Sequence, residues 1–173
     1  MKAKMFCPYC GEKVIEKSFG GRNHRYCRNC DRIHYENPLP ATAALVLNHR
    51  NQLLLVKRSV EPAKGKWCLP GGFIEIDETI EEAVLRELEE ETGIRGEIEG
   101  LVDFFSQMSQ HYRAILIFGY KVKILGGELK AGDDAEDAGF FGLDALPPIA
   151  FLSHQRLIEK GFDDMGIFNQ VIQ

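Results

Sequence analysis

The sequence predicts an α/β fold with a mixed sheet between helical layers, preceded by a small zinc ribbon. Three observations support this: a four-cysteine pattern near the N-terminus, strand and helix segments in irregular alternation, and one helix with clear signals at both ends. A regular strand-helix alternation would instead favour a fully parallel sheet. At 173 residues the chain suits one domain of ordinary size plus an appendage, which we place at 37–173 and 1–36.

The first expected element is the ribbon. Cys7 and Cys10 form one C-x-x-C pair, and Cys27 and Cys30 form a second pair after sixteen intervening residues. This spacing is typical of a tetrahedral zinc site with four thiolate ligands, which leaves no open position for catalysis. So short a segment cannot bury enough core to fold alone, so zinc must stabilise it. Disulfides are the alternative, but the start of the chain lacks the apolar run of a signal peptide, and we expect a cytoplasmic protein with reduced thiols.

The main domain is expected to follow a proline-rich junction at 34–40. Apolar residues at 43–47 and 53–56 predict two strands joined by a turn at 48–51. The fifth cysteine, Cys68, is expected to be a small core residue. The later elements are strands at 101–105, 114–124 and 140–141, a turn at Gly126-Gly127, and a C-terminal helix at 153–160.

Between these strands lies an acidic helix that begins after Thr79 and ends at Gly93. Thr79 and Glu82 form a capping box, in which each side chain satisfies a free backbone N–H of the other residue. Gly93 can adopt the left-handed conformation that terminates a helix. Apolar residues at helical spacing form the buried stripe: Ile80, Val84 and Leu88.

Charge is strongly unbalanced around this helix. Residues 72–94 carry nine carboxylates and one basic residue, Arg86. Glu87, Glu90 and Glu91 share one side of the helix and border its buried stripe, where they would repel one another unless hard cations lay among them. We therefore predict a divalent metal site. A solvated acidic face is the alternative, and it suits the other helix carboxylates better: Glu81, Glu82 and Glu89.

The same segment resembles the complete Nudix box. The matching positions are Gly72, Glu78, Arg86, Glu87, Leu88, Glu90, Glu91, Gly93 and Ile94. The resemblance extends over about 40–155 and implies a Nudix α/β/α sandwich that hydrolyses a nucleoside diphosphate linked to another group. It also implies that Glu90 and Glu91, with the Gly71 carbonyl, are the principal ligands of Mg²⁺ or Mn²⁺. Glu87 would be a ligand or the general base, and Arg86 would orient Glu87 through a bidentate ion pair.

Three residues outside the box are further candidates for the site. Arg58 follows a strand and could hold a phosphate oxygen, although a solvated arginine is an equal alternative. Glu136, in the acidic segment 133–137, could complete a metal shell or activate water, or could lie in a solvated loop. Tyr112 could stack on adenine, although aromatic residues in strands more often belong to the core.

A zinc ribbon before a Nudix domain resembles the NADH pyrophosphatase branch and its shorter relatives. NADH-specific members carry a Ser-Gln-Pro-Trp-Pro-Phe-Pro stretch after the box. This chain has Ser106-Gln107 and then Met-Ser-Gln-His at 108–111, without proline or tryptophan. The departure favours ADP-ribose or FAD, cleaved with release of AMP, over NADH.

Composition bounds the partners. A net charge of −5 disfavours a general nucleic-acid binder, and no apolar stretch reaches the ~20 residues needed to cross a bilayer. We expect a nucleotide substrate, with a monomer or a homodimer left open. A nucleotide-sensing regulator without catalysis, and a zinc-ribbon adaptor, remain alternative functions.

Overall fold

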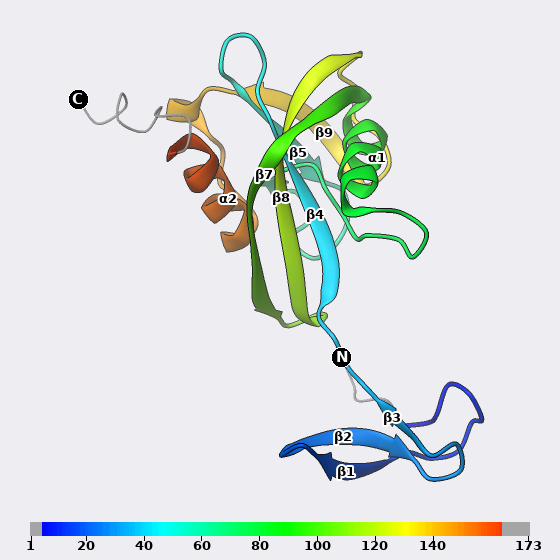
Figure 1. Ribbon diagram of the computed structural model, residues 1–173. Coiled ribbons are helices and arrows are strands. Elements are labelled where there is room, and N and C mark those ends of the chain that lie inside the picture. The colour runs from blue at the N-terminus through cyan, green and yellow to red at the C-terminus, as the bar shows by residue number, and fades with distance from the viewer. Residues whose placement is uncertain (1–4, 164–173) are drawn as a thin grey trace.

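The computed structural model describes residues 5–163 (Figure 1). Its first unit is an antiparallel sheet of β1 (Ile15–Phe19), β2 (Arg22–Cys27) and β3 (Arg32–His34), in the order β1-β2-β3. These strands lie within the segment predicted to be the ribbon. Residues 1–4 and 164–173 lie outside the described part, so the predicted bounds 1–36 and 37–173 stay predictions.

The main domain contains two further three-stranded sheets. In one, β4 pairs in parallel with β8, and β8 pairs antiparallel with β7. In the other, β5 lies between β6 and β9 and is antiparallel to both. The strands are β4 (Leu39–Val46), β5 (Leu53–Arg58), β6 (Trp67–Cys68), β7 (Ile94–Ser109), β8 (Arg113–Gly127) and β9 (Ala135–Phe141). Parallel and antiparallel pairs occur together, so the prediction of a mixed sheet is confirmed.

Helices α1 (Ile80–Thr92) and α2 (Leu152–Asp163) cover opposite sides of β4 (Figure 1), and η1 (Leu143–Ala145) is a short 3-10 helix. Ala43 and Leu45 belong to a core cluster with residues of α2, whereas Ala44 and Val46 belong to a cluster with residues of α1. Successive strand residues point to opposite faces, so both faces of β4 are covered, and residues 43–46 form a continuous apolar run. Each large apolar side chain buried here stabilises the fold by about 1.5–3 kcal/mol.

The predicted ends of the acidic helix are confirmed. The backbone N–H of Glu82 donates to the Thr79 hydroxyl at 3.2 Å, and the backbone N–H of Thr79 donates to the Glu82 carboxylate at 2.8 Å. Gly93 has a φ of 70°, in the left-handed region. The capping box fixes the start of α1 and therefore fixes which side of the helix each carboxylate occupies.

The strands after α1 are longer than predicted, and the turn at Gly126-Gly127 was predicted wrongly. β7 starts at Ile94. Its exposed residues alternate with inward-facing ones, so its first part forms no apolar run and was not recognised as a strand. Both glycines pair with the first residues of β7. Gly127 has a φ of 99°, and a Cβ there would collide with the Gly93 carbonyl. Glycine at this position therefore allows two strands to pack closely, and it does not form a turn.

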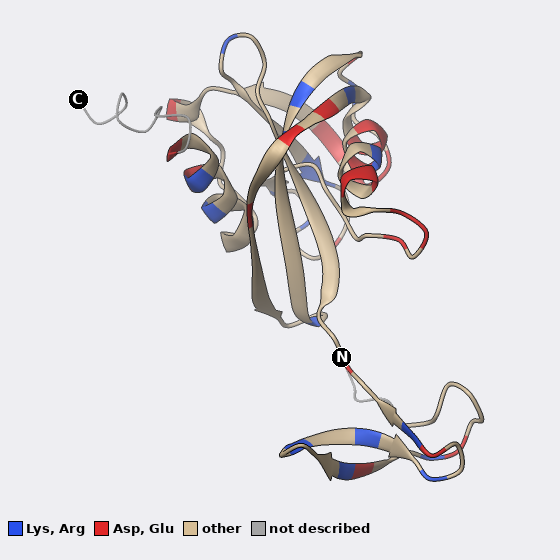
Figure 2. Ribbon diagram, in the orientation of Figure 1, with Lys and Arg blue, Asp and Glu red and all other residues tan. Residues whose placement is uncertain are grey.

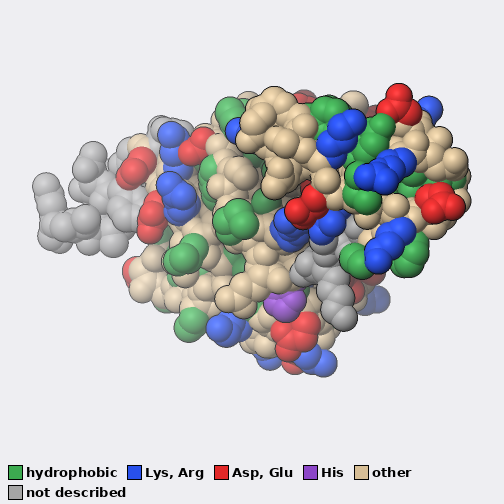
Figure 3. All heavy atoms as spheres, turned by 90° about the horizontal axis from the view of Figure 1, so that it is seen from below, with side chains coloured by type: hydrophobic (Ala, Val, Ile, Leu, Met, Phe, Trp, Pro, Cys, Tyr) green, Lys and Arg blue, Asp and Glu red, His purple; other side chains and the backbone are tan. Residues whose placement is uncertain are grey.

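Charge is unevenly distributed over the molecule. Figure 2 shows that acidic residues are gathered on α1 and on the loop before it. Basic and hydrophobic side chains interleave on the face that Figure 3 presents. Within the described part of the chain, no helix is both long enough and apolar enough to cross a membrane.

Candidate active site

The four cysteines of the two C-x-x-C pairs meet in space. Their sulfur atoms all lie within 4.8 Å of one another, with Cys7 Sγ 3.9 Å from Cys30 Sγ and Cys10 Sγ 3.5 Å from Cys27 Sγ. Zn–S bonds of ~2.3 Å in a tetrahedron place sulfur atoms ~3.8 Å apart, whereas a disulfide requires ~2.05 Å. The cluster therefore fits a zinc ion and not a pair of disulfides, and all four cysteines are free thiols.

The fifth cysteine is separate from this cluster. Cys68 is 2% exposed and packs in the main domain. Burial raises the pKa of its thiol to about 12, so the thiol is neutral at physiological pH. The prediction of a small core residue is confirmed.

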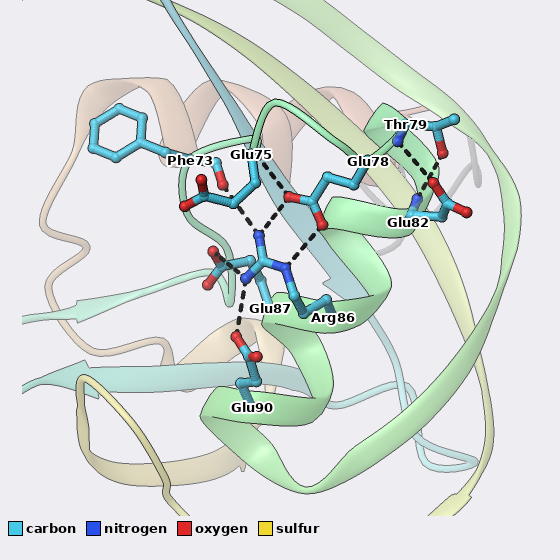
Figure 4. Close-up of polar contacts among 8 residues, drawn as sticks. All are labelled: Phe73, Glu75, Glu78, Thr79, Glu82, Arg86, Glu87 and Glu90. Carbon is cyan, nitrogen blue, oxygen red and sulfur yellow. Dashed lines mark hydrogen bonds and ion pairs between the residues drawn. The ribbon is translucent and has the colours of Figure 1, made fainter.

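Arg86 is the centre of the ion pairs beside α1 (Figure 4). Its guanidinium binds Glu78 through two hydrogen bonds of 2.9 and 2.6 Å, and donates to Glu87 and to Glu90 at 2.9 Å each. A fifth hydrogen bond reaches the Phe73 carbonyl at 3.2 Å. One side chain therefore ties the loop that precedes α1 to two carboxylates of the helix.

This arrangement corrects one expectation. The bidentate partner of Arg86 is Glu78, and Glu87 receives a single hydrogen bond. Glu78 lies next to the start of α1, where a parallel approach of two N–H groups is possible, whereas Glu87 immediately follows Arg86 and is reached from the side. The hydrogen bonds from Arg86 lower the pKa of Glu78 to about 2, so this carboxylate stays ionised and the ion pair persists over the physiological range.

Glu91 is the most buried of the three clustered carboxylates. It is 5% exposed, and the backbone N–H of Gly71 donates to it at 2.9 Å. Burial raises its pKa to about 8, and the negative charges of Glu87 and Asp133 act in the same direction. The surroundings of Glu91 therefore disfavour its ionised form, and a bound cation would stabilise that form.

Glu87 and Glu90 complete the group in different ways. Burial also raises the pKa of Glu87, whose carboxylate packs so closely against Gly72 that a Cβ there would collide with it. The side chain of Glu90 is 48% exposed and turns to Arg86. The three hard oxygen donors fit Mg²⁺ chemically. The oxygen atoms of these three carboxylates do not all lie within 4.8 Å of one another. In residues 5–163 the four-cysteine cluster is the only group of three or more possible ligand atoms that meets this distance.

The acidic segment 133–137 runs into β9, and Glu136 lies in that strand. Glu136 is half exposed and its carboxylate accepts a hydrogen bond from Lys57 Nζ at 3.1 Å. Asp133 is instead the residue whose charge raises the pKa of both Glu87 and Glu91. Sequence reasoning did not single out Asp133. The backbone of Asp133 is left-handed, with a φ of 45°. The sequence alone does not show which residue of this acidic segment adopts that conformation.

A cavity of about 510 Å³ is lined by Gly71, which bonds Glu91, and by Gly72, which packs against Glu87, while none of the three carboxylates lines it. Its walls include Arg58 at the end of β5, Thr42 in β4 and residues of β8. They also include the loop 71–73, the tip of the β7–β8 hairpin at 107–112 and residues 150–154 at the start of α2. Both predicted binding residues line it. Arg58 Nε donates to the Pro62 carbonyl at 2.7 Å, and Tyr112 packs edge-on against Phe73 with ring centroids 5.0 Å apart.

Two polar side chains in this wall were missed from the sequence. His154 is 7% exposed, and its Nδ1 accepts a hydrogen bond of 3.0 Å from the backbone N–H of Leu69. Thr42 is 2% exposed, and its hydroxyl has no hydrogen-bond partner in residues 5–163. Neither residue belongs to a recognisable motif, so only the fold reveals that they line the cavity.

Comparison with known proteins gives a consistent result. The family described as NUDIX domain matches residues 37–160. An ADP-ribose pyrophosphatase of Methanocaldococcus jannaschii is 37% identical over 163 residues, which cover 92% of this chain and 95% of that protein. A crystal structure of a NUDIX hydrolase from Nitrosomonas europaea superimposes with a TM-score of 0.81 at 29% identity and covers 94% of both chains.

A second type of relative is longer. The NAD-capped RNA hydrolase NudC of Chromobacterium violaceum is 33% identical over 161 residues, which cover 92% of this chain but only 58% of that protein. The chain therefore spans little more than half of this relative, whereas it spans nearly all of the archaeal one.

Proposed function

Because this chain belongs to the Nudix hydrolase family, we propose that it hydrolyses ADP-ribose, or less readily FAD, with release of AMP. The observation that carries the proposal is the buried carboxylate of Glu91, bonded to the loop 71–73, which lines a 510 Å³ cavity. Cavities of ~300–1,000 Å³ are typical of small-molecule sites. The similarity to an ADP-ribose pyrophosphatase over nearly its whole length supports this substrate.

Mg²⁺, or Mn²⁺ in its place, would be held by Glu87, Glu90 and Glu91 together with the Gly71 carbonyl. When bound, the divalent cation supplies a Lewis acid that neutralises the charge of the pyrophosphate. Arg86 orients Glu87 and Glu90 through its hydrogen bonds. Glu90 must leave this ion pair, at least in part, to act as a ligand.

The chain's own side chains would carry the remaining tasks. Glu87 is half-buried with a raised pKa, which suits a general base that accepts a proton from the attacking water. Arg58 would bind phosphate oxygens, and Tyr112 would stack on the adenine at the rim of the cavity. Glu136 remains a candidate for the outer shell, and Asp133 joins it. Water attack breaks the P–O–P bond and leaves AMP and ribose 5-phosphate.

We also propose that residues 1–36 form a structural zinc ribbon and that 37–173 form the hydrolase domain. The geometry of the four sulfur atoms supports a closed tetrahedral site. A closed site gives zinc no part in the hydrolysis.

A substrate panel tests the function. Initial rates are measured with ADP-ribose, FAD and NADH at subsaturating concentration in excess Mg²⁺, and AMP is quantified by chromatography. We expect kcat/KM for ADP-ribose to exceed that for NADH several-fold, since contacts with each half of the substrate are worth ~1–3 kcal/mol. A clear preference for NADH would refute the argument from residues 106–111. No turnover of any member would favour the nucleotide-sensing alternative.

A matched pair of variants tests the carboxylates. Glu90→Gln should lower turnover strongly because it removes a proposed ligand charge. Glu89→Gln removes the same charge from an exposed position of the same helix and should leave turnover near that of the wild type. Equal rates for Glu90→Gln and the wild type under limiting Mg²⁺ would refute the assignment.

NADH and other dinucleotides are the second candidate substrates, and what favours them is the similarity to a relative named for hydrolysis of NAD-capped RNA. The stretch at 107–112 lines the cavity in this chain, so its sequence bears directly on this choice. The same panel separates the two candidates.

A further inference from the structure

His154 is a buried polar side chain that the proposed chemistry leaves without a task. The backbone N–H of Leu69 donates to its Nδ1 at 3.0 Å. A backbone N–H can meet only a lone pair, so Nδ1 carries no proton and the proton of the neutral imidazole is on Nε2. The ring is therefore fixed as an acceptor on one side and as an N–H donor on the other.

The imidazole also stays uncharged. Burial, together with the positive charge of Arg58, lowers the pKa of His154 to about 3. The ring also packs against Phe151, whose ring centroid lies 5.2 Å away. His154 consequently presents a permanent neutral N–H group to its surroundings.

The free side of the ring belongs to the cavity. His154 lines it together with Arg58, and in residues 5–163 no protein acceptor receives a hydrogen bond from Nε2. The Thr42 hydroxyl, in the same cavity wall, also has no partner there. A buried polar group left without a partner costs about 1–3 kcal/mol. The unpartnered Thr42 hydroxyl, together with the free N–H donor of His154, therefore suits this wall to a polar ligand.

The location indicates which part of a ligand would be reached. Leu69 lies two residues before Gly71, whose N–H bonds Glu91, and the charge of Arg58 acts on both Glu91 and His154. His154 and Glu91 thus both accept a hydrogen bond from the backbone of the short segment 69–71, and His154 lines the cavity. The Nε2–H of His154 can only donate a hydrogen bond, and it lies in the same cavity wall as Arg58. Such a pair suits an anionic oxygen, which can only accept hydrogen bonds.

We propose that His154 is a substrate-binding residue whose Nε2–H donates to a phosphoryl oxygen of the bound pyrophosphate beside Arg58. This inference rests on the proposed function, which supplies the pyrophosphate. The contact helps to select substrates that place a phosphoryl oxygen at this depth. Because it holds the ground state and the transition state alike, it should affect KM and leave kcat nearly unchanged.

Two substitutions separate the two nitrogens of the ring. His154→Asn keeps an oxygen near Nδ1 that can accept from Leu69, but lacks the donor at Nε2. His154→Gln reaches the position of Nε2 with an amide N–H, but cannot accept from Leu69 at the same time. Melting temperature, KM and kcat for ADP-ribose, and calorimetric Kd for inorganic pyrophosphate with Mg²⁺ are measured for both variants and for the wild type.

We expect a crossed pattern. His154→Asn should melt near the wild type while KM and the pyrophosphate Kd rise about tenfold or more, which is the size of a lost hydrogen bond to a charged group. His154→Gln should melt lower but bind closer to the wild type. Unchanged KM and Kd in His154→Asn, or a rise in both variants that follows their loss of melting temperature, would overturn the proposal.

The pyrophosphate measurement keeps this proposal distinct from the proposed function. If the wild type does not cleave ADP-ribose but His154→Asn weakens pyrophosphate binding, the substrate assignment fails and the role of His154 stands. If the wild type cleaves ADP-ribose while the Asn variant binds pyrophosphate as tightly as the wild type, the role of His154 fails. Failure of the wild type to bind pyrophosphate would also overturn it.

Discussion

Replacing Glu91 by Gln should stabilise the magnesium-free protein and abolish its turnover. The carboxyl group is 5% exposed, and burial raises its pKa from the ordinary 4.5 to about 8. Gln has nearly the same shape and can still accept the hydrogen bond from the Gly71 N–H, so the substitution removes mainly the cost of the buried charge. It also removes a proposed metal ligand, which is the reason for the loss of turnover.

The magnitude follows from the two pKa values. The folded protein holds a proton on Glu91 that the unfolded chain releases between pH 4.5 and about 8. Stability of the wild type therefore falls as pH rises through this window, by about 1.4 kcal/mol per pH unit. At pH 7 the wild type should have lost about 3 kcal/mol through this group, and the Gln variant should have lost none of it.

Urea denaturation at several pH values between 5 and 8 measures this difference. Buffers without added Mg²⁺, and without chelators that would strip zinc, isolate the effect of the carboxyl group. Glu89→Gln, on the exposed side of α1, is the control and should follow the wild type. If the stability difference between Glu91→Gln and the wild type did not grow with pH, the buried carboxyl group would not be the cause.

Two further substitutions test other parts of the structure. Gly72→Ala should lower turnover at least tenfold because the added Cβ would displace the Glu87 carboxylate. Gly100→Ala is the control, since no atom lies within 4 Å of the added Cβ, and its turnover should equal that of the wild type. Equal turnover of the two variants would contradict the close packing of Gly72 against Glu87. Cys27→Ser should lose zinc, measured by metal analysis, and melt at a lower temperature, whereas the control Cys68→Ala should keep its zinc. Loss of turnover in Cys27→Ser without a change in melting temperature would contradict a structural role of the zinc.

The parts of the fold that the sequence predicted are those with local signals. Thr79, Glu82 and Gly93 specify the ends of α1 through hydrogen bonds and backbone angles within a few residues. The cysteine pairs likewise reveal the metal cluster because the ligand spacing itself carries the information. For such features the sequence contains nearly everything that the physical argument needs.

The parts that could not be predicted depend on contacts distant in sequence. The hydrogen bond between Leu69 and His154 joins residues 85 positions apart, and no local pattern reports it. β7 was predicted too short because its partner β8 stabilises polar residues that do not form an apolar run. The bidentate ion pair from Arg86 to Glu78 spans eight residues, whereas the resemblance to the Nudix box had implied Glu87 as the partner.

The cavity and the carboxylates come from different parts of the chain. The carboxylates belong to α1, whereas much of the cavity wall comes from the β7–β8 hairpin tip and from the start of α2. Selectivity can therefore change by substitution at 108–112 while the hydrolytic chemistry is inherited unaltered. A library randomised at these positions would be a practical way to retarget the enzyme to other diphosphate compounds, with the acidic helix serving as a fixed and reusable part.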